Sequence, residues 1–194
     1  GGIEATCKAI YDAVDLYDCR ITNISSGIIA DNEKLREAIA YAEKKNVLVV
    51  SAVGNSNLSS PDVTYYPAAY ETVIGVGAAK NENEAADFSQ RNTSVKLLAP
   101  GTNIPTVPIA NSSKPVKVSG SSYAAAYVTG AAALLLEANP KLSAAQLRDI
   151  LINSARDIGL EGYDTETGWG LLDISKALSE LRVYKTKTSK TSLQ

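Results

Sequence analysis

Apolar residues near the start of the chain recur at steps of four and three, the spacing that defines one face of an amphipathic helix. The residues on this face are Ile3, Cys7, Ile10, Val14 and Tyr17. A second helix is expected after Asp31 or Asn32, because both side chains are good helix caps. Its apolar side consists of Leu35, Ala38, Ile39 and Ala42. The pattern therefore predicts two amphipathic helices in the first quarter of the chain.

Short segments that suit strands separate and follow these helices. A first extended segment, ITNIS, covers residues 21–25, and largely apolar runs occupy residues 47–50, 73–78 and 95–99. A continuous run rich in β-branched residues is typical of a strand that is covered on both faces, as in a parallel sheet. The sequence thus predicts about four core strands.

The longest apolar segment, residues 122–138, is apolar on all sides, which predicts a buried helix. Asn139 and Pro140 end it. Ser143 and Gln146 form a capping box that begins another helix. Because helices alternate with buried strands, we expect an α/β fold with three layers, α/β/α, around a mostly parallel sheet.

A chain of 194 residues is long enough for one hydrophobic core and too short to favour two. A last helix is expected from Asp173, and the end of the chain is rich in Lys, Thr and Ser. We therefore predict one domain over residues 1–182 and a polar tail over residues 183–194. The hydrophobic and charged fractions, 45% and 21%, are those of an ordinary soluble globular protein.

Charge and residue usage argue against several classes of partner. A formal net charge of -2 gives no reason to expect binding to nucleic acid or to an anionic membrane. No signal peptide and no membrane span are visible, so the cytoplasm is the default expectation. The chain has no histidine, and Cys7 and Cys19 are not in a CxxC pattern, so neither a metal site nor another cofactor is predicted. Two free thiols are expected, and a disulfide stays open.

One candidate for catalysis is Ser122, which follows a Gly/Ser turn and begins the long apolar helix. Free N–H groups and the positive end of the helix dipole surround a serine in this position. They suit a nucleophile whose tetrahedral intermediate carries a negative oxygen. The simpler alternative is that Ser122 only caps the helix.

Two loops offer further candidates. Asn55 follows the run at residues 47–50, and ligands in open parallel sheets bind beyond the carboxyl ends of strands. Its amide either donates to an oxyanion or closes an Asx-turn. Ser25, Ser26 and Gly27 end the preceding strand and, taken alone, are only a loop.

In order and spacing, eight short motifs resemble the subtilisin (subtilase) family of serine proteases across residues 20–181. The motifs are ITNISSG at 21–27, VVSAVGN at 49–55, VIGVGA at 73–78, FS at 88–89, LAPG at 98–101, GSSYA at 120–124, GAAALL at 130–135 and GWG at 168–170. Each motif alone is weak, but the ordered set is specific. An unrelated ligand site on an α/β domain would require the whole set to be a coincidence.

The resemblance implies roles for particular residues. Ser122 matches the nucleophile, its own N–H is one oxyanion donor, and Asn55 matches the asparagine that supplies the other. The residues that match the two walls of the pocket for the residue before the scissile bond are Ser25, Ser26 and Gly27, and Ala52, Val53 and Gly54. The strand edge at residues 25–27 would pair with the substrate backbone. Tyr65 falls near the base of that pocket, which implies a narrowed pocket, and Tyr66-Pro67 matches a cis peptide bond.

The family's aspartate and histidine lie N-terminal to every motif found here. The resemblance therefore implies a truncated domain, the nucleophile and oxyanion half of a subtilisin-like serine endopeptidase, which we expect to be inactive alone because serine without a base is a weak nucleophile. Nothing supports Lys96 or Lys117 as a substitute base. The alternative is a naturally truncated pseudoprotease that binds a peptide or protein.

Truncation would also expose the strand edge at residues 21–25. Unpaired edges pair readily with other chains. We expect a peptide or protein as substrate, and at this edge either a second copy, which would make a homodimer, or the missing N-terminal half.

Overall fold

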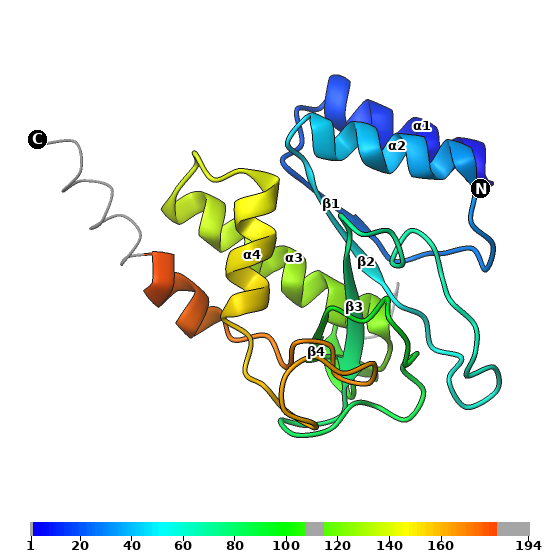
Figure 1. Cartoon of the computed structure of the whole chain (residues 1–194), viewed down its shortest axis with the longest axis vertical. Coiled ribbons are helices and arrows are strands. Elements are labelled where there is room, and N and C mark those ends of the chain that lie inside the picture. Colours follow the sequence, from blue (N-terminus) through cyan, green and yellow to red (C-terminus); the bar gives the residue numbers. More distant parts are fainter. Residues whose placement is uncertain (1, 108–114, 182–194) are drawn as a thin grey trace, which may run out of the picture.

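The computed structural model describes residues 2–107 and 115–181, and the predicted polar tail lies outside these ranges. The described chain forms three layers, with a sheet between two groups of helices (Figure 1). Helices α1 (Ile3–Asp15) and α2 (Glu33–Lys44) cover one face of the sheet. Helices α3 (Ser121–Ala138) and α4 (Ala144–Asn153) cover the other face, together with a last helix over residues 174–181. The predicted α/β/α architecture is confirmed.

Four parallel strands form the central sheet in the order β1-β2-β3-β4. They are β1 (Ile21–Ile24), β2 (Leu48–Ala52), β3 (Ile74–Ala79) and β4 (Leu97–Pro100). The number and type of core strands agree with the prediction, although β2, β3 and β4 each begin one or two residues later than the apolar runs. Among the described residues, strand β1 is an edge strand, and β2 is its only neighbour in this sheet.

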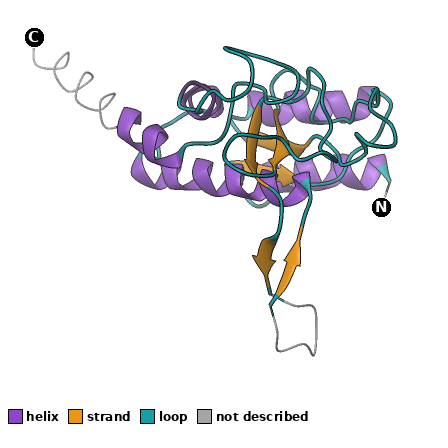
Figure 2. Cartoon of the chain, turned by 90° about the horizontal axis from the view of Figure 1, so that it is seen from below, coloured by secondary structure: helices purple, strands orange, loops and turns teal. Residues whose placement is uncertain are grey.

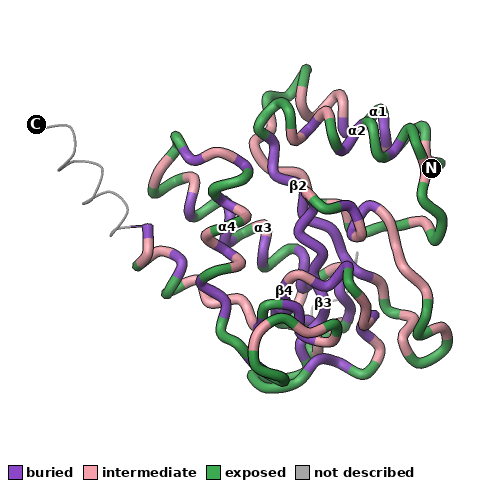
Figure 3. The backbone as a smooth tube through the Cα atoms, in the orientation of Figure 1, coloured by how far each residue is buried: buried purple, intermediate pink, exposed green. Residues whose placement is uncertain are grey.

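The core explains why the strands carry continuous apolar runs. Successive residues of a strand point to opposite faces, so a strand between two helical layers needs apolar residues at every position. Leu48 and Val50 pack with α3 and α4, whereas Val47 and Val49 pack with α1 and α2. The tube in Figure 3 accordingly shows β2 and β3 as continuously buried, whereas the edge strand β1 has no fully buried residue.

Local sequence signals place the ends of the smaller helices. Asn32, not Asp31, caps α2, because its side chain accepts a hydrogen bond from the N–H of Leu35. Ser143 and Gln146 form both hydrogen bonds of the predicted capping box at α4.

The first helix is shorter than expected. It ends at Asp15, so Tyr17 lies in the following loop, is 73% exposed and is not part of the apolar face.

The prediction that the long apolar helix is buried on all sides is wrong for α3. One side packs against the sheet, with Ala124, Val128 and Leu135 fully buried. On the opposite side Tyr127 and Leu134 are 40% and 44% exposed. The helix is apolar all round, but the described chain covers only one of its faces.

An antiparallel hairpin of β5 (Ile104–Thr106) and β6 (Val116–Val118) was not predicted. It projects away from the three layers (Figure 2). Each strand has only three residues, and Ile104 is the apolar residue that reaches the surface of α3. Strands this short carry too few positions to show a period in the sequence.

The described part of the chain has neither a membrane-spanning helix nor a metal cluster. No helix within residues 2–107 and 115–181 combines the length and the hydropathy that crossing a membrane requires. The same ranges hold no cluster of histidine, cysteine and carboxylate side chains with the geometry of a metal site. Cys7 is buried in α1 and Cys19 lies in the loop after it, and both are free thiols.

Candidate active site

Three segments that are distant in sequence meet at the carboxyl end of the sheet. Ser25 follows β1, Gly54 and Asn55 follow β2, and α3 begins beside both loops. Because β1 and β2 are parallel neighbours, their carboxyl ends lie at the same edge of the sheet. Hydrogen bonds link the start of α3 to each loop. The structure therefore brings the predicted nucleophile, oxyanion donor and pocket walls together.

Ser122 is not the cap of α3. Gly120 occupies the N-cap position and has no side chain that could make a capping hydrogen bond. The half-buried Ser122 side chain instead donates from its hydroxyl to the carbonyl oxygen of Ser25 at 3.4 Å. Its backbone N–H lies in the first turn, where an α-helix has no acceptor of its own. Ser122 thus presents a hydroxyl and a free amide at the positive end of the helix dipole.

The orientation of the Asn55 amide is fixed by a backbone donor. Its Oδ1 accepts a hydrogen bond from the N–H of Ser121 at 2.8 Å. Only the oxygen of an amide side chain accepts hydrogen bonds, so Nδ2 must point the other way. Nδ2 lies 3.5 Å from the position that a Cβ on Gly120 would occupy, and it donates to no group in the described chain. A free N–H₂ donor is therefore held beside the start of α3.

Ser121 is a site residue that sequence reasoning did not identify. It is completely buried, and its Oγ accepts from the N–H of Gly54 at 3.3 Å while its own N–H binds Asn55. One residue thus ties the loop after β2 to the start of α3. The sequence offers two adjacent serines, and no single-sequence signal distinguishes the one that positions the loop from the one that faces outward.

The two predicted pocket walls flank Ser122. Ser25, which begins one wall, is exposed and contacts Ser122, whereas Ala52 and Val53 of the other wall are buried and lead into Gly54. Gly54 has a φ of +105°, a conformation that favours glycine. Ser26 and Gly27 continue the first wall and are also exposed.

Tyr65 lies between the two walls. Its Cβ is 3.3 Å from the position that a Cβ on Gly27 would occupy, and its ring atoms Cδ2 and Cε2 are 2.4 and 2.6 Å from the same position on Gly54. The Tyr65 hydroxyl lies 2.9 Å from the Ser56 hydroxyl, and the two form a hydrogen bond. The sequence placed Tyr65 near the base of this pocket, and the structure places its ring in contact with both sides.

The segment after Tyr65 supports the first wall. Ile28 and Tyr66 exchange two backbone hydrogen bonds of 3.0 and 2.8 Å, and the Tyr66-Pro67 peptide bond is cis, as the resemblance implied. The ring of Tyr66 lies 5.0 Å from that of Tyr70. Burial and a hydrogen bond to Asp31 raise the pKa of Tyr70 to about 12, so it stays a neutral donor at this support.

No described residue near Ser122 offers a base. The sequence has no histidine, and the hydroxyl of Ser122 has the Ser25 carbonyl as its partner. Lys96 donates to the carbonyl oxygen of Thr93 and lies over the ring of Tyr163, so its ammonium is engaged elsewhere. The arrangement can hold a carbonyl group and stabilise an oxyanion, but it holds no group that accepts the serine proton.

Comparison with known proteins places these features in one family. The family model described as "Subtilase family" matches residues 1–170. The chain is 32% identical over 180 residues to the minor extracellular protease Epr of Bacillus subtilis. The matched region covers 89% of this chain and 27% of Epr. It is 34% identical over 158 residues to subtilisin DY of Bacillus licheniformis. Here the matched region covers 81% of this chain and 56% of subtilisin DY. The chain therefore spans about half or less of these relatives.

Solved structures agree with the sequence relatives. The prenylagaramide maturation protease PagA superposes with a TM-score of 0.82 at 27% identity, covering 93% of this chain and 68% of that chain. Fervidolysin from Fervidobacterium pennivorans gives a TM-score of 0.80 at 31% identity, covering 92% of this chain and 29% of that chain. By sequence and by fold, this chain belongs to the subtilase family of serine proteases.

Proposed function

We propose that this chain is the nucleophile and oxyanion half of a subtilisin-like serine endopeptidase. Ser122 attacks the carbonyl carbon of a peptide bond, and its own N–H and the Nδ2 of Asn55 bind the oxygen that becomes negative. The backbone at residues 25–27 pairs with the peptide, and the walls formed by Ser25, Ser26 and Gly27 and by Ala52, Val53 and Gly54 receive the side chain before the scissile bond. The substrate is a peptide or protein.

The observation that carries this proposal is the orientation of Asn55. Its Oδ1 accepts from the N–H of Ser121, so Nδ2 points the other way and lies beside Gly120, at the start of the helix that carries Ser122. Preorganised donors of this kind stabilise a tetrahedral intermediate because they need no reorganisation when charge develops. A helix N-cap or an Asx-turn would not require this arrangement.

We further propose that the chain alone does not hydrolyse peptide bonds. A serine hydroxyl needs a base to become an effective nucleophile, and the sequence has no histidine. In a subtilisin, loss of the serine or of the histidine lowers turnover by about 10⁶, whereas loss of one oxyanion donor costs about 3–4 kcal/mol. Asn55 and the N–H of Ser122 therefore do not compensate for a missing base.

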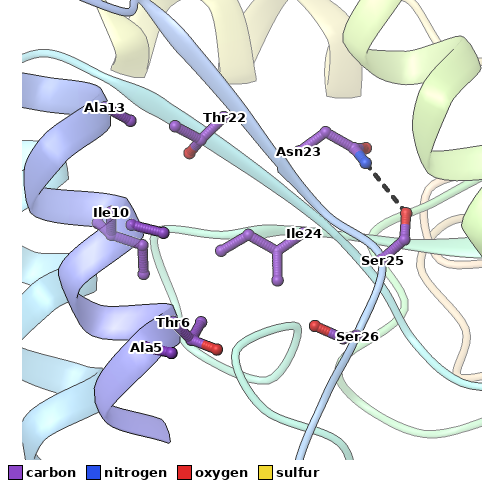
Figure 4. Close-up of a pocket in the computed structure, with 10 residues that line it drawn as sticks. Ala5, Thr6, Ile10, Ala13, Thr22, Asn23, Ile24, Ser25 and Ser26 are labelled. Carbon is purple, nitrogen blue, oxygen red and sulfur yellow. Dashed lines mark hydrogen bonds between the residues drawn. The ribbon is translucent and has the colours of Figure 1, made fainter. Parts of the chain in front are cut away.

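A partner strand at β1 belongs to the same proposal. A groove of about 480 Å³ runs between α1 and the free edge of β1, with side chains from Thr22 to Ser26 on one side and from Ala5 to Ala13 on the other (Figure 4). The Oγ1 of Thr22 is buried without a hydrogen-bond partner in the described chain. An additional strand would cover this edge, supplied either by a second copy or by the N-terminal half of the domain.

The exposed face of α3 supports an additional layer as well. An apolar hollow of about 560 Å³ lies over Tyr127, Gly130 and Leu134 and extends to Ile104 and Ile174. Soluble monomers seldom leave a continuous apolar surface open without a use for it. Because α3 contacts β1, a second part of the domain that paired with β1 would lie beside this helix.

The test of this function is the reaction of the 194-residue chain with a fluorophosphonate probe that phosphonylates active serine hydroxyls. We expect labelling of Ser122 no faster than that of the exposed Ser119 in the loop before α3, with Ser122→Ala and Ser119→Ala as matched controls. Rapid labelling that Ser122→Ala abolishes would show an active base and contradict inactivity. A pseudoprotease would give the same slow labelling of Ser122 in this assay. Its Ser122 would also stay unreactive after its partner is added.

A further inference from the structure

The space between the two walls beside Ser122 is occupied by a side chain of the protein itself. A Cβ added to Gly54 would lie 2.4 and 2.6 Å from ring atoms of Tyr65, which is too close for carbon atoms in non-bonded contact. On the opposite wall, a Cβ on Gly27 would come within 3.3 Å of the Cβ of Tyr65. The gap between the ring and the Gly54 wall is therefore narrower than one methyl group.

The ring is also held in this position. The hydroxyl groups of Tyr65 and Ser56 form a hydrogen bond of 2.9 Å, and Ser56 belongs to the same loop as Gly54. On the other side, Tyr66 is fixed by its two backbone hydrogen bonds to Ile28. Tyr65 is thus anchored at its hydroxyl and at its backbone, so moving the ring aside requires breaking at least one of these contacts.

We propose that Tyr65 restricts the substrate to peptides with Gly, Ala or Ser immediately before the scissile bond. This inference rests on the proposed function. A peptide whose carbonyl group reaches Ser122 and whose backbone pairs with residues 25–27 directs that side chain toward the walls. A hydrogen atom, a methyl group or a hydroxymethyl group fits outside the ring. A leucine or phenylalanine side chain has to displace it.

The test measures binding of product-like peptides, so that it needs no catalysis by the chain. Two peptides that differ only in a C-terminal Ala or Phe, each with a free carboxylate, are titrated into the isotopically labelled 194-residue chain. The backbone amide signals of Ser25, Ser26 and Gly27 report binding at the proposed edge. We expect the Ala peptide to bind about tenfold or more tightly than the Phe peptide.

Variants assign this preference to the ring. Tyr65→Gly should remove most of the discrimination by strengthening binding of the Phe peptide, whereas Tyr65→Phe, which keeps the ring, should retain part of it. Ser56→Ala frees the hydroxyl of Tyr65 without touching the ring and should also weaken the discrimination, which keeps a test available if Tyr65→Gly does not fold. Tyr17→Gly, at an exposed tyrosine outside the site, is the control and should leave the ratio unchanged.

The outcomes separate the two proposals. Equal affinity of the wild type for both peptides, or an unchanged ratio in a folded Tyr65→Gly, overturns the role of Tyr65 while the edge still binds peptide. If neither peptide shifts the signals of residues 25–27 in any folded variant, the proposed peptide-binding function fails, and the inference about Tyr65 fails with it.

Discussion

Ser122 and Ser25 form a reciprocal pair across the edge of the sheet. The hydroxyl of Ser122 donates to the carbonyl oxygen of Ser25 at 3.4 Å, and the hydroxyl of Ser25 donates to the carbonyl oxygen of Ser122 at 3.3 Å. Both distances are at the long end for hydrogen bonds between oxygens. The pair therefore holds the Ser122 hydroxyl loosely, and we expect that a peptide at the proposed edge would displace this hydroxyl from the Ser25 carbonyl at little cost.

The adjacent serines should differ in their effect on stability. We expect Ser122→Ala to change the free energy of unfolding by less than about 0.5 kcal/mol, because it removes one long, partly exposed hydrogen bond. Ser121→Ala should lower it by about 1 kcal/mol or more, because the N–H of Gly54 loses its acceptor inside the protein. Urea titration of both variants measures the difference. Equal losses would contradict the distinction between a positioning serine and a free one.

The sequence predicted the layers and the strands because burial on both faces imposes a strong pattern. The continuous run from Val47 to Val50 reflects contact with two helical layers, so the pattern indicated a covered parallel strand before any contact was known. The same logic failed for α3. Its apolar residues predict burial on all sides, but whether a covering layer is present depends on residues outside the helix itself.

The sequence identified residues of the candidate site, but it did not predict how their side chains are oriented. Ser122 and Asn55 stand in recognisable motifs, and the structure brings them to one edge. The orientation of the Asn55 amide depends on the N–H of Ser121, and the position of the Tyr65 ring depends on Ser56. Both are tertiary contacts, so no spacing along the chain encodes them. The short β5–β6 hairpin has too few residues to leave a periodic signal.

Two glycines should respond oppositely to the same substitution. A Cβ at Gly75, in the buried strand β3, would lie 1.9 Å from the carbonyl oxygen of Ser94, so Gly75→Ala should destabilise the chain by about 3 kcal/mol. A Cβ at Gly130, in α3, meets nothing within 4 Å, and Gly130→Ala should stabilise the helix by about 0.5–1 kcal/mol. Thermal unfolding of both variants provides the measurement, and a destabilising Gly130→Ala would contradict the open face of α3.

Asp164 should make stability depend on pH. Burial alone would raise the pKa of this carboxyl group, but hydrogen bonds from the Thr167 hydroxyl and from the N–H groups of Thr167 and Glu166 outweigh it and lower the pKa below 3.8. A carboxyl group with a lowered folded pKa stabilises the fold above 3.8 and loses this contribution as pH falls through the folded value.

We therefore expect Asp164→Asn to destabilise the chain at pH 7 and to differ less from the wild type as the pH falls below 3.8. Urea unfolding at a series of pH values measures the difference, with the exposed Glu161→Gln as control. A stability difference that stays constant down to the lowest pH would show that the hydrogen bonds do not depend on the charge.

The free edge of β1 should control association. Thr22→Lys places a charge in the groove between α1 and β1, and a charged edge resists pairing with another strand. We expect the wild type to associate in a concentration-dependent way and Thr22→Lys to shift toward monomer, whereas Ala40→Lys on the exposed side of α2 should have no effect. Sedimentation velocity at several concentrations measures this. A wild type that stays monomeric throughout would exclude the homodimer and leave pairing with an N-terminal half.

Supplying the missing base tests the central claim most directly. The N-terminal portion of a subtilisin relative, with its aspartate and histidine, is fused ahead of this chain, and hydrolysis of a peptide with alanine before the scissile bond is measured. We predict activity that Ser122→Ala lowers by about 10⁶ and that Ser119→Ala leaves unchanged. A folded fusion without activity, or one whose activity survives Ser122→Ala, would contradict the role of Ser122 as the attacking residue.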